Sequence, residues 1–105
     1  MTSHLTPLAV CERMIGPIEL ISVLCGYSEK AAYRWRHPSN TRAGGDFPSL
    51  RDLRRLHAHV RAHDLPLKPE WLIWGAFEDE VEAAIRAHPC PLPLVARLRP
   101  EVAAQ

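Results

Sequence analysis

The chain has 105 residues, of which 47% are hydrophobic and 24% charged, and its formal net charge is +1 at neutral pH. These values are typical of a single globular domain and exclude wholesale disorder. No apolar run approaches the roughly 20 residues of a membrane span, and residues 1–10 lack the pattern of a signal peptide, so we expect a cytoplasmic protein.

Proline, glycine and capping residues predict two helices in the first quarter of the chain. Thr6, followed by proline, is typical of a helix start, and this helix is expected to run to about Ile15. Gly16 is its candidate C-cap. Pro17 begins the second helix, whose apolar residues recur at helical spacing until Gly26 ends it.

Three more helices are expected after a loop at residues 39–48. Ser49, with Asp52 as its capping-box partner, begins the first of them. A short helix follows from Pro69, the last helix spans residues 77–87, and little of the sequence is typical of strands. The residues expected to face inward from the first and last of these helices are Leu50, Leu53, Leu56 or His57, Val60, Phe77, Val81, Ala84 and Ile85.

These elements predict an all-α fold, a compact bundle of five or six short helices that contains a helix-turn-helix. Residues 1–88 form the expected domain, and the proline-rich residues 89–105 are expected to be a loosely ordered tail. The cysteines Cys11, Cys25 and Cys90 are odd in number and far apart, so we expect reduced thiols rather than a disulfide framework. The first two lie in apolar surroundings and are expected in the core.

The helix-turn-helix is predicted from the spacing of a few small residues. Ser22 places a small side chain where two helices cross, and Gly26 lies at the turn, where a positive φ is easiest for glycine. Ser28 is expected to cap a recognition helix that runs to about His37, where the following proline stops it. This helix is the element expected to enter the major groove of DNA.

The recognition helix would present a face rich in hydrogen-bond donors. Ala32 and Trp35 are expected to face inward, against the preceding helix. The residues that then face outward are Glu29, Lys30, Tyr33, Arg34 and His37. The last four of them share one face of an α-helix. Such a face suits base edges and phosphates.

Charge is distributed unevenly along the chain. Residues 30–63 contain eight lysines and arginines and two aspartates, whereas residues 64–82 contain six acidic residues and one lysine. A basic half joined to an acidic half suggests one face for a polyanion and one turned away from it. Two solvated helix faces would give the same counts, so charge alone leaves both interpretations open.

The motif resembles the lambda-repressor-like helix-turn-helix of phage Cro/CI regulators and, more narrowly, the YdaS-like branch of small phage regulators. The resemblance covers about residues 12–76. It includes Gly-Asp-Phe-Pro at 45–48 and Lys-Pro-Glu-Trp-Leu-Ile-Trp-Gly at 68–75. The motif positions that carry it are Ser22, Gly26, Tyr27, Ser28 and Trp35. The resemblance implies sequence-specific binding to double-stranded DNA, commonly as a homodimer on a two-fold symmetric operator.

The chain departs from this family pattern at four places. Ser22 stands where alanine is usual, and Ala32 where a branched apolar residue is usual. Ile18 replaces a glutamine that often contacts a phosphate, and the loop at residues 38–47 is longer than usual. The first two are packing changes, the third removes one expected backbone contact, and the fourth leaves open whether Arg42 in this loop touches DNA.

The residues expected to contact DNA are Ser28, Glu29, Lys30, Tyr33, Arg34, Arg36, His37 and Arg42. Lys30 and Arg34 are the candidates for base edges, guanine above all. Tyr33 is a candidate for a phosphate or a thymine methyl group. Glu29 either accepts from cytosine or complements the helix dipole, and Ser28 either bonds a phosphate or only caps. The candidates for the DNA backbone are Arg36, His37, Arg42 and, if the helix from Ser49 faces DNA, Arg51, Arg54 and Arg55.

The sequence therefore predicts a phage-derived, DNA-binding transcriptional regulator that is associated with the nucleoid. A repressor is expected rather than an activator. No nucleophile, base and orienting residue form a trio and no loop cradles phosphate, so we expect neither an enzyme nor a cofactor. His59 and His63 have the i, i+4 spacing of metal ligands. No second pair follows, and a solvated histidine face without metal is the expectation.

Two alternatives share the predicted fold. One is an adaptor that binds a protein partner through Trp71, Trp74 and the acidic helix at residues 78–82. The other is an accessory subunit for DNA packaging or recombination. Trp71, Trp74 and Phe77 form an aromatic cluster that closes the core, makes a dimer interface, or does both.

Overall fold

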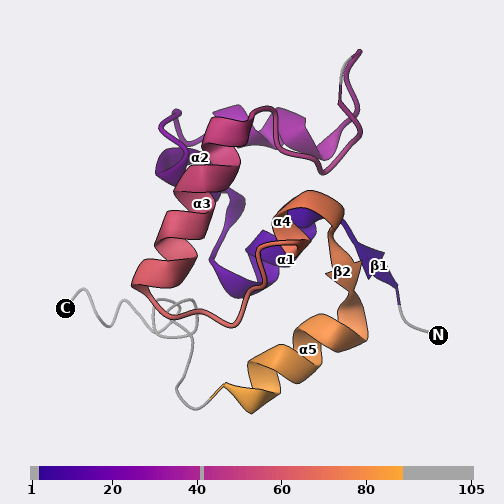
Figure 1. Ribbon diagram of the computed structural model, residues 1–105. Helices are drawn as coiled ribbons and strands as arrows, with labels where there is room; N and C mark the ends of the chain where they lie inside the picture. Colours follow the sequence, from indigo (N-terminus) through magenta and orange to yellow (C-terminus); the bar gives the residue numbers. More distant parts are fainter. Residues whose placement is uncertain (1–2, 41, 89–105) are drawn as a thin grey trace.

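Helices from both halves of the chain surround helix α1 in the computed structural model, which describes residues 3–40 and 42–88 (Figure 1). The expected all-α bundle of short helices is confirmed, with a small two-stranded sheet added. The predicted tail, residues 89–105, lies outside the described residues. The elements are β1 (His4–Leu5), α1 (Pro7–Met14), α2 (Ile18–Leu24), the 3₁₀ helix η1 (Ala31–Arg36), α3 (Leu50–Ala62), α4 (Trp71–Trp74), β2 (Ala76–Phe77) and α5 (Glu78–Ala87).

Helix α1 begins as its sequence predicts. The amide of Ala9 donates to the Thr6 hydroxyl at 3.2 Å, so the cap satisfies one free donor of the first turn. The helix ends at Met14, and Gly16 follows without the positive φ of a glycine C-cap. Val10 and Cys11 are fully buried, and α1 packs against α4, α2 and β1.

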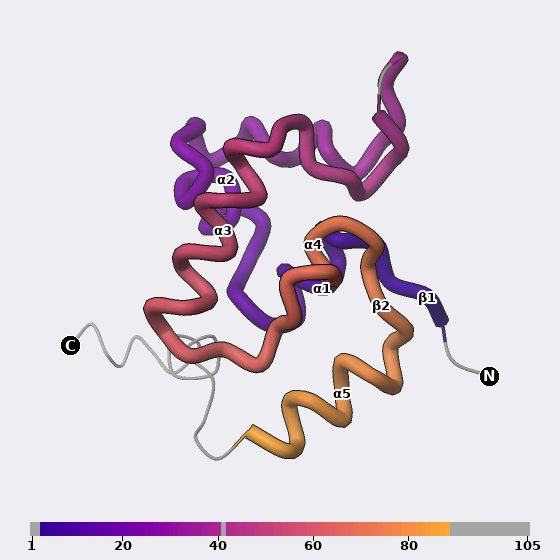
Figure 2. The backbone as a smooth tube through the Cα atoms, viewed as in Figure 1, coloured from indigo at the N-terminus to yellow at the C-terminus, as the bar shows by residue number. Residues whose placement is uncertain are grey.

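The strands β1 and β2 tie the start of the chain to the segment between α4 and α5 (Figure 2). They run antiparallel, with Leu5 opposite Ala76. Gly75 precedes β2 with φ of 76°, and a Cβ placed there would lie 2.1 Å from the Leu5 carbonyl oxygen, so the two backbones approach closely only because this residue is glycine. Two-residue strands leave no alternating pattern, and the sequence therefore did not predict them.

Helix α3 faces the core with Leu53, Leu56 and Val60, as predicted, but not with Leu50. Its cap is confirmed, because the Asp52 amide donates to the Ser49 hydroxyl at 3.4 Å. The buried positions are Asp52, Leu56 and Val60. Leu50 is 59% exposed because, at roughly 100° per residue, it points away from that stripe. The prediction that Leu50 faces inward is wrong.

The predicted aromatic cluster is divided between core and surface. Trp71 is 6% exposed and belongs to the core, whereas Trp74 is 73% exposed. Phe77 is 47% exposed and makes an edge-to-face contact with the His4 ring, with ring centroids 5.0 Å apart. Phe77 was expected to face inward from the last helix. It lies instead in β2 and at the N-cap of α5, where Val81 takes the buried position.

The recognition helix is shorter and tighter than predicted. A 3₁₀ helix, Ala31–Arg36, replaces the α-helix expected from Ser28 to His37. The carbonyl of Trp35, which an α-helix would offer to a later amide, accepts from Gly45 at 2.7 Å instead. His37 has the extended ψ of 151° that the following proline favours. The shortening is at the start, since η1 begins at Ala31 rather than at Ser28, and its end at Arg36 is close to the predicted one.

Ser22 of α2, rather than Ser28, satisfies the start of η1. Its buried hydroxyl donates to the Ser28 carbonyl and accepts from the Ala32 amide at 3.2 Å. The N-cap residue of η1, Lys30, makes no side-chain cap bond. The prediction of a Ser28 cap is therefore wrong. Ser22 stands where the Cro/CI-like pattern usually has alanine, and its hydroxyl makes the bonds that Ser28 was expected to make.

We expect Ser22→Ala to lower the free energy of unfolding by about 1–3 kcal/mol, because it leaves the buried Ala32 amide without an acceptor. Urea denaturation followed by circular dichroism measures the change. Ser28→Ala is the matched control and is expected to stay within about 0.5 kcal/mol of the wild type. A larger loss in Ser28→Ala than in Ser22→Ala would show that Ser28 is the cap after all.

Candidate nucleic-acid interface

The turn between α2 and η1 brings together a group of side chains from three elements. Gly26 has φ of 94°, as the sequence predicted for the turn. The Tyr27 ring is half-buried and meets the edge of the Trp35 ring, with centroids 5.6 Å apart. Ala32 and Trp35 are buried, as expected. Of the remaining η1 residues, Tyr33, Arg34 and Arg36 are exposed.

The eight predicted DNA-contacting residues have different surroundings in the structure. Ser28, Glu29 and Lys30 are exposed in the turn before η1. Arg34 and His37 are also exposed, and neither pairs with a carboxylate of the described residues. The other three have partners in the fold, and these are Tyr33, Arg36 and Arg42.

Tyr33 and Arg36 lie in one row because residues three apart eclipse in a 3₁₀ helix. Arg36 forms an ion pair with Glu12 of α1, with 2.8 Å between Nη2 and Oε2. Tyr33 donates to the carboxylate of Glu19 in α2. This bond lowers the pKa of Glu19 and raises the pKa of Tyr33, and the Glu12 bond raises the pKa of Arg36. Both side chains are thus held by carboxylates of the preceding helices.

Arg42 stabilises its own loop. Its Nη1 lies 3.1 Å from the Trp35 carbonyl oxygen and 3.3 Å from those of Ala43 and Asp46. Nη2 lies 3.4 Å from the Arg34 carbonyl oxygen. One guanidinium therefore joins the end of η1 to the long loop, and its donors point at backbone rather than at solvent. The sequence left open whether Arg42 touches DNA. These four bonds give Arg42 a structural role as the alternative.

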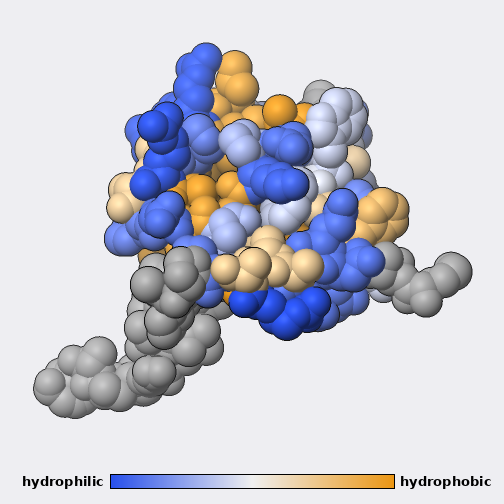
Figure 3. Space-filling model, turned by 60° about the horizontal axis from the view of Figure 1, so that its bottom comes forward, coloured by the Kyte–Doolittle hydropathy of each residue, from blue (hydrophilic) through white to orange (hydrophobic). Residues whose placement is uncertain are grey.

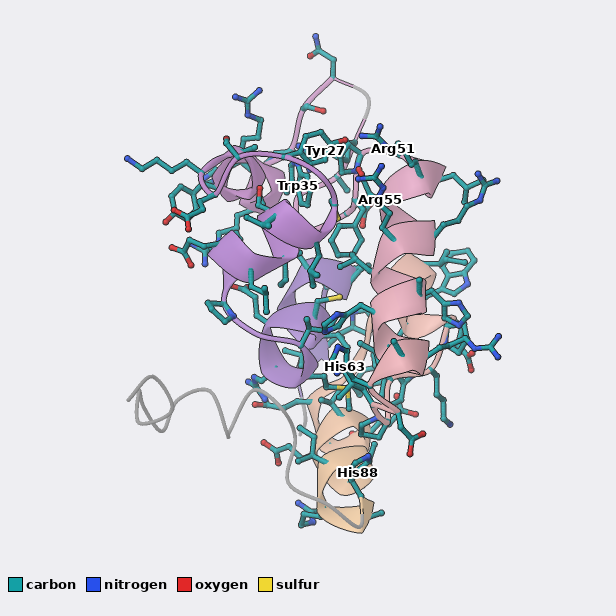
Figure 4. All side chains as sticks on the ribbon, turned by 90° about the vertical axis from the view of Figure 1, so that its left-hand side faces the viewer. Tyr27, Trp35, Arg51, Arg55, His63 and His88 are labelled. Carbon is teal, nitrogen blue, oxygen red and sulfur yellow. The ribbon has the colours of Figure 1, made fainter. Side chains whose placement is uncertain are left out.

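Two arginines of α3 also reach the turn (Figure 4). Arg55 donates from Nη1 to the Cys25 carbonyl at 3.0 Å. Arg51 donates to the Tyr27 hydroxyl at 3.1 Å, and its Cζ lies 5.6 Å from the centre of that ring. Arg54, which the sequence grouped with them, lines a groove toward α4 instead. Arg51 and Arg55 therefore lie on the face of α3 toward the turn, and Arg54 lies on the face toward α4.

The Tyr27 hydroxyl connects Arg51 to a buried carboxylate. Tyr27 donates to Asp52 Oδ2 at 3.3 Å, and Asp52 is fully buried. The predicted capping box had Asp52 bonding back to Ser49, but this carboxylate turns toward the turn instead. Its Oδ1 has no hydrogen-bond partner among the described residues. No local sequence signal joins positions 25 residues apart, so this contact escaped prediction.

A shallow hollow lies between η1 and the loop that follows it. Its volume is about 420 Å³, and its lining combines aromatic, apolar and cationic side chains. The lining residues are Tyr27, Ala31, Arg34, Trp35, Ser39, Arg42 and Pro48. Arg34 is thus placed at the edge of a concave surface that also includes the end of the loop.

The basic and acidic residues belong to elements on opposite sides of the molecule, because α5 lies away from α2 and the start of α3 (Figure 1). The turn and η1 carry Lys30 and Arg34, and α3 adds Arg51 and Arg55 beside them. Among the described residues, none of the four pairs with a carboxylate. We call these four residues the basic end. The asymmetry seen in the sequence is therefore also an asymmetry in space.

Helix α5 carries the opposite charge. Its first five residues include four acids, of which Glu78 and Glu82 lie 2.8 Å and 3.8 Å from the Arg13 guanidinium. Figure 3 brings this end forward and shows hydrophilic side chains along it. Since Arg13 belongs to α1, the acidic helix is bound to the core on the side away from the turn.

Histidines and cysteines do not form a metal site within residues 3–40 and 42–88. The ring centroids of His59 in α3 and of His63 at its C-cap lie 4.3 Å apart, and His88 Nε2 lies 2.8 Å from the Asp64 carbonyl oxygen. Cys11 and Cys25 are free thiols in the core, as expected. Burial raises the pKa of both, that of Cys25 to about 12.

The comparisons identify no relatives. The chain matches no known family model, no curated protein and no solved structure. Over the part of the chain that the structure describes, no helix is long and apolar enough to span a membrane.

We expect Arg42→Ala to lower the free energy of unfolding by about 1–3 kcal/mol, because it removes charge-assisted bonds to several backbone carbonyls. Hydrogen exchange of the Gly45 amide, which bonds to Trp35, is expected to accelerate. Arg34→Ala removes a nearby exposed arginine and is the control, expected within about 0.5 kcal/mol of the wild type. Equal stability of the two variants would contradict a structural role for Arg42.

Proposed function

We propose that this protein binds double-stranded DNA sequence-specifically and regulates transcription, with α2 and η1 as the two helices of a Cro/CI-like helix-turn-helix. The observation that carries the proposal is the basic end. Its four cations belong to the turn, η1 and the part of α3 that contacts the turn, and none has a carboxylate partner among the described residues. A polyanion would find its attraction there and not at the acidic α5.

Within this proposal, direct readout rests on Lys30 and Arg34. Both are exposed at the start and the middle of the segment that would enter the major groove. Arg34 has the planar donor group that recognises guanine by two hydrogen bonds. Arg51 and Arg55 are placed beside the turn, where phosphate contacts would fix the register of the helix on the duplex. Ser28, Glu29 and His37 are exposed as well, as are the carboxylate-bonded Tyr33 and Arg36.

We expect selection from a random duplex library to enrich a short motif, which Arg34→Ala weakens by about 1–3 kcal/mol at one or two base pairs. Affinity is expected to fall steeply with salt. Arg86→Ala, which removes an exposed arginine of the acidic helix, is the matched control and leaves the motif and the affinity unchanged. No enriched motif, or equal losses in the two variants, would reject the proposal.

A second candidate function, protein binding through α4, is favoured by exposed apolar side chains. Trp74 is 73% exposed, Ile73 54% and Leu50 59%. Ile73 and Leu50 also line a groove of about 180 Å³ between α3 and α4. Aromatic residues are enriched at protein interfaces. This surface serves either a second copy of the chain, as a two-fold symmetric operator would require, or a different protein.

We expect Trp74→Ser to shift a dimer toward monomer by at least about tenfold in dissociation constant, since truncating an aromatic anchor costs about 2 kcal/mol or more. Sedimentation equilibrium measures the constant. Phe77→Ser removes a half-exposed aromatic side chain of β2 rather than of α4 and is the comparison variant. A monomeric wild type, or equal effects of the two substitutions, would rule out a dimer through α4.

A further inference from the structure

Two carboxylates hold the η1 row, which consists of Tyr33 and Arg36. Glu12 of α1 binds Arg36 at 2.8 Å, and Glu19 of α2 accepts from the Tyr33 hydroxyl. Arg36 Cζ also lies 5.9 Å from the centre of the Tyr33 ring. The contacts cross 24 and 14 residues of sequence, so the fold and not the local helix creates them.

These contacts lie at the surface. The side chain of Arg36 is 50% exposed and that of Glu12 is 31% exposed. An exposed ion pair contributes little to stability because solvent screens it. The two carboxylates are therefore poor candidates for holding the fold together, and their effect on the charge of the η1 row is the larger consequence.

A carboxylate and a phosphate ester offer the same chemistry to these side chains. Each presents anionic oxygens to a guanidinium or a phenol hydroxyl. The carboxylates of Glu12 and Glu19 thus occupy Arg36 and Tyr33 in the way that a DNA phosphate would. Arg36 enters a complex already paired, unlike Arg34, which lies in the same helix without a carboxylate partner among the described residues.

We propose that Glu12 and Glu19 are autoinhibitory: they occupy Arg36 and Tyr33 in the free protein, and DNA phosphates must displace them. This inference rests on the proposed function, because it assigns a competitor to the same surface. The consequence is that η1 attracts any duplex less strongly than its count of basic residues implies. Base contacts by Lys30 and Arg34 then make up a larger share of the binding free energy.

The test is a double-mutant cycle on DNA binding. Wild type, Glu12→Gln, Arg36→Gln and the double variant are titrated with a random-sequence duplex over a range of salt concentrations. We expect Glu12→Gln to tighten binding about two- to fivefold and to make the log-log salt slope about 0.9 more negative, as one more phosphate contact would. In the Arg36→Gln background, Glu12→Gln is expected to change neither quantity.

A second cycle isolates the other contact. Glu19→Gln is expected to tighten binding in the wild type and to have no effect when Tyr33→Phe has removed the hydroxyl. Glu12→Asp keeps the charge and shortens the reach, and it is expected to fall between the wild type and Glu12→Gln. Thermal unfolding of each variant checks that the fold is kept, as expected for exposed contacts.

The outcomes separate this inference from the function on which it rests. Equal tightening by Glu12→Gln with and without Arg36 would overturn the inference, because the carboxylate would then act only through its long-range field. Weaker binding by Glu12→Gln would overturn it as well, since the carboxylate would be orienting Arg36 rather than competing for it. A wild type that binds no duplex at any salt concentration would instead reject the DNA-binding function itself.

Discussion

The buried hydroxyl of Ser22 is the interaction on which the exposed surface of η1 depends. One oxygen donates to the Ser28 carbonyl and accepts from the Ala32 amide, so it fixes both the end of the turn and the first residues of η1. Because Ala32 is held against α2, Trp35, three residues later on the same face of the 3₁₀ helix, is also buried in the core. The residues between and after them are then exposed. A single side chain in one helix thereby determines which face of the next helix meets solvent.

The same turn also positions α3. The Cys25 carbonyl accepts from Arg55, and the Tyr27 hydroxyl lies between Arg51 and the buried Asp52. Gly26, with its positive φ, allows the chain to present these groups to α3. Contacts that stabilise the packing of α3 thus also place two arginines at the edge of η1. Structure and surface charge are coupled here because the same side chains serve both.

Local signals in the sequence were sufficient for most of the helical frame. The caps at Thr6 and Ser49 and the glycine turn at Gly26 act through bonds within a few residues, and they were predicted. The two-residue strands pair segments from opposite ends of the described chain, and the start of η1 depends on the Ser22 hydroxyl of another helix. Periodicity and propensity contain no information about such partners, so these features were missed.

The candidate site shows the same limit more sharply, because three arginines within nine residues have three different surroundings. Arg34 is exposed without a carboxylate partner among the described residues, Arg36 is paired with Glu12, and Arg42 is bound to backbone carbonyls. In the sequence each is simply one positive charge near a predicted recognition helix. An arginine that already binds a carboxylate or backbone carbonyls has fewer free donors for DNA than an unpaired one. Tertiary contacts decide which arginines are paired. A basic segment therefore predicts attraction to a polyanion, whereas the choice among its residues requires the structure.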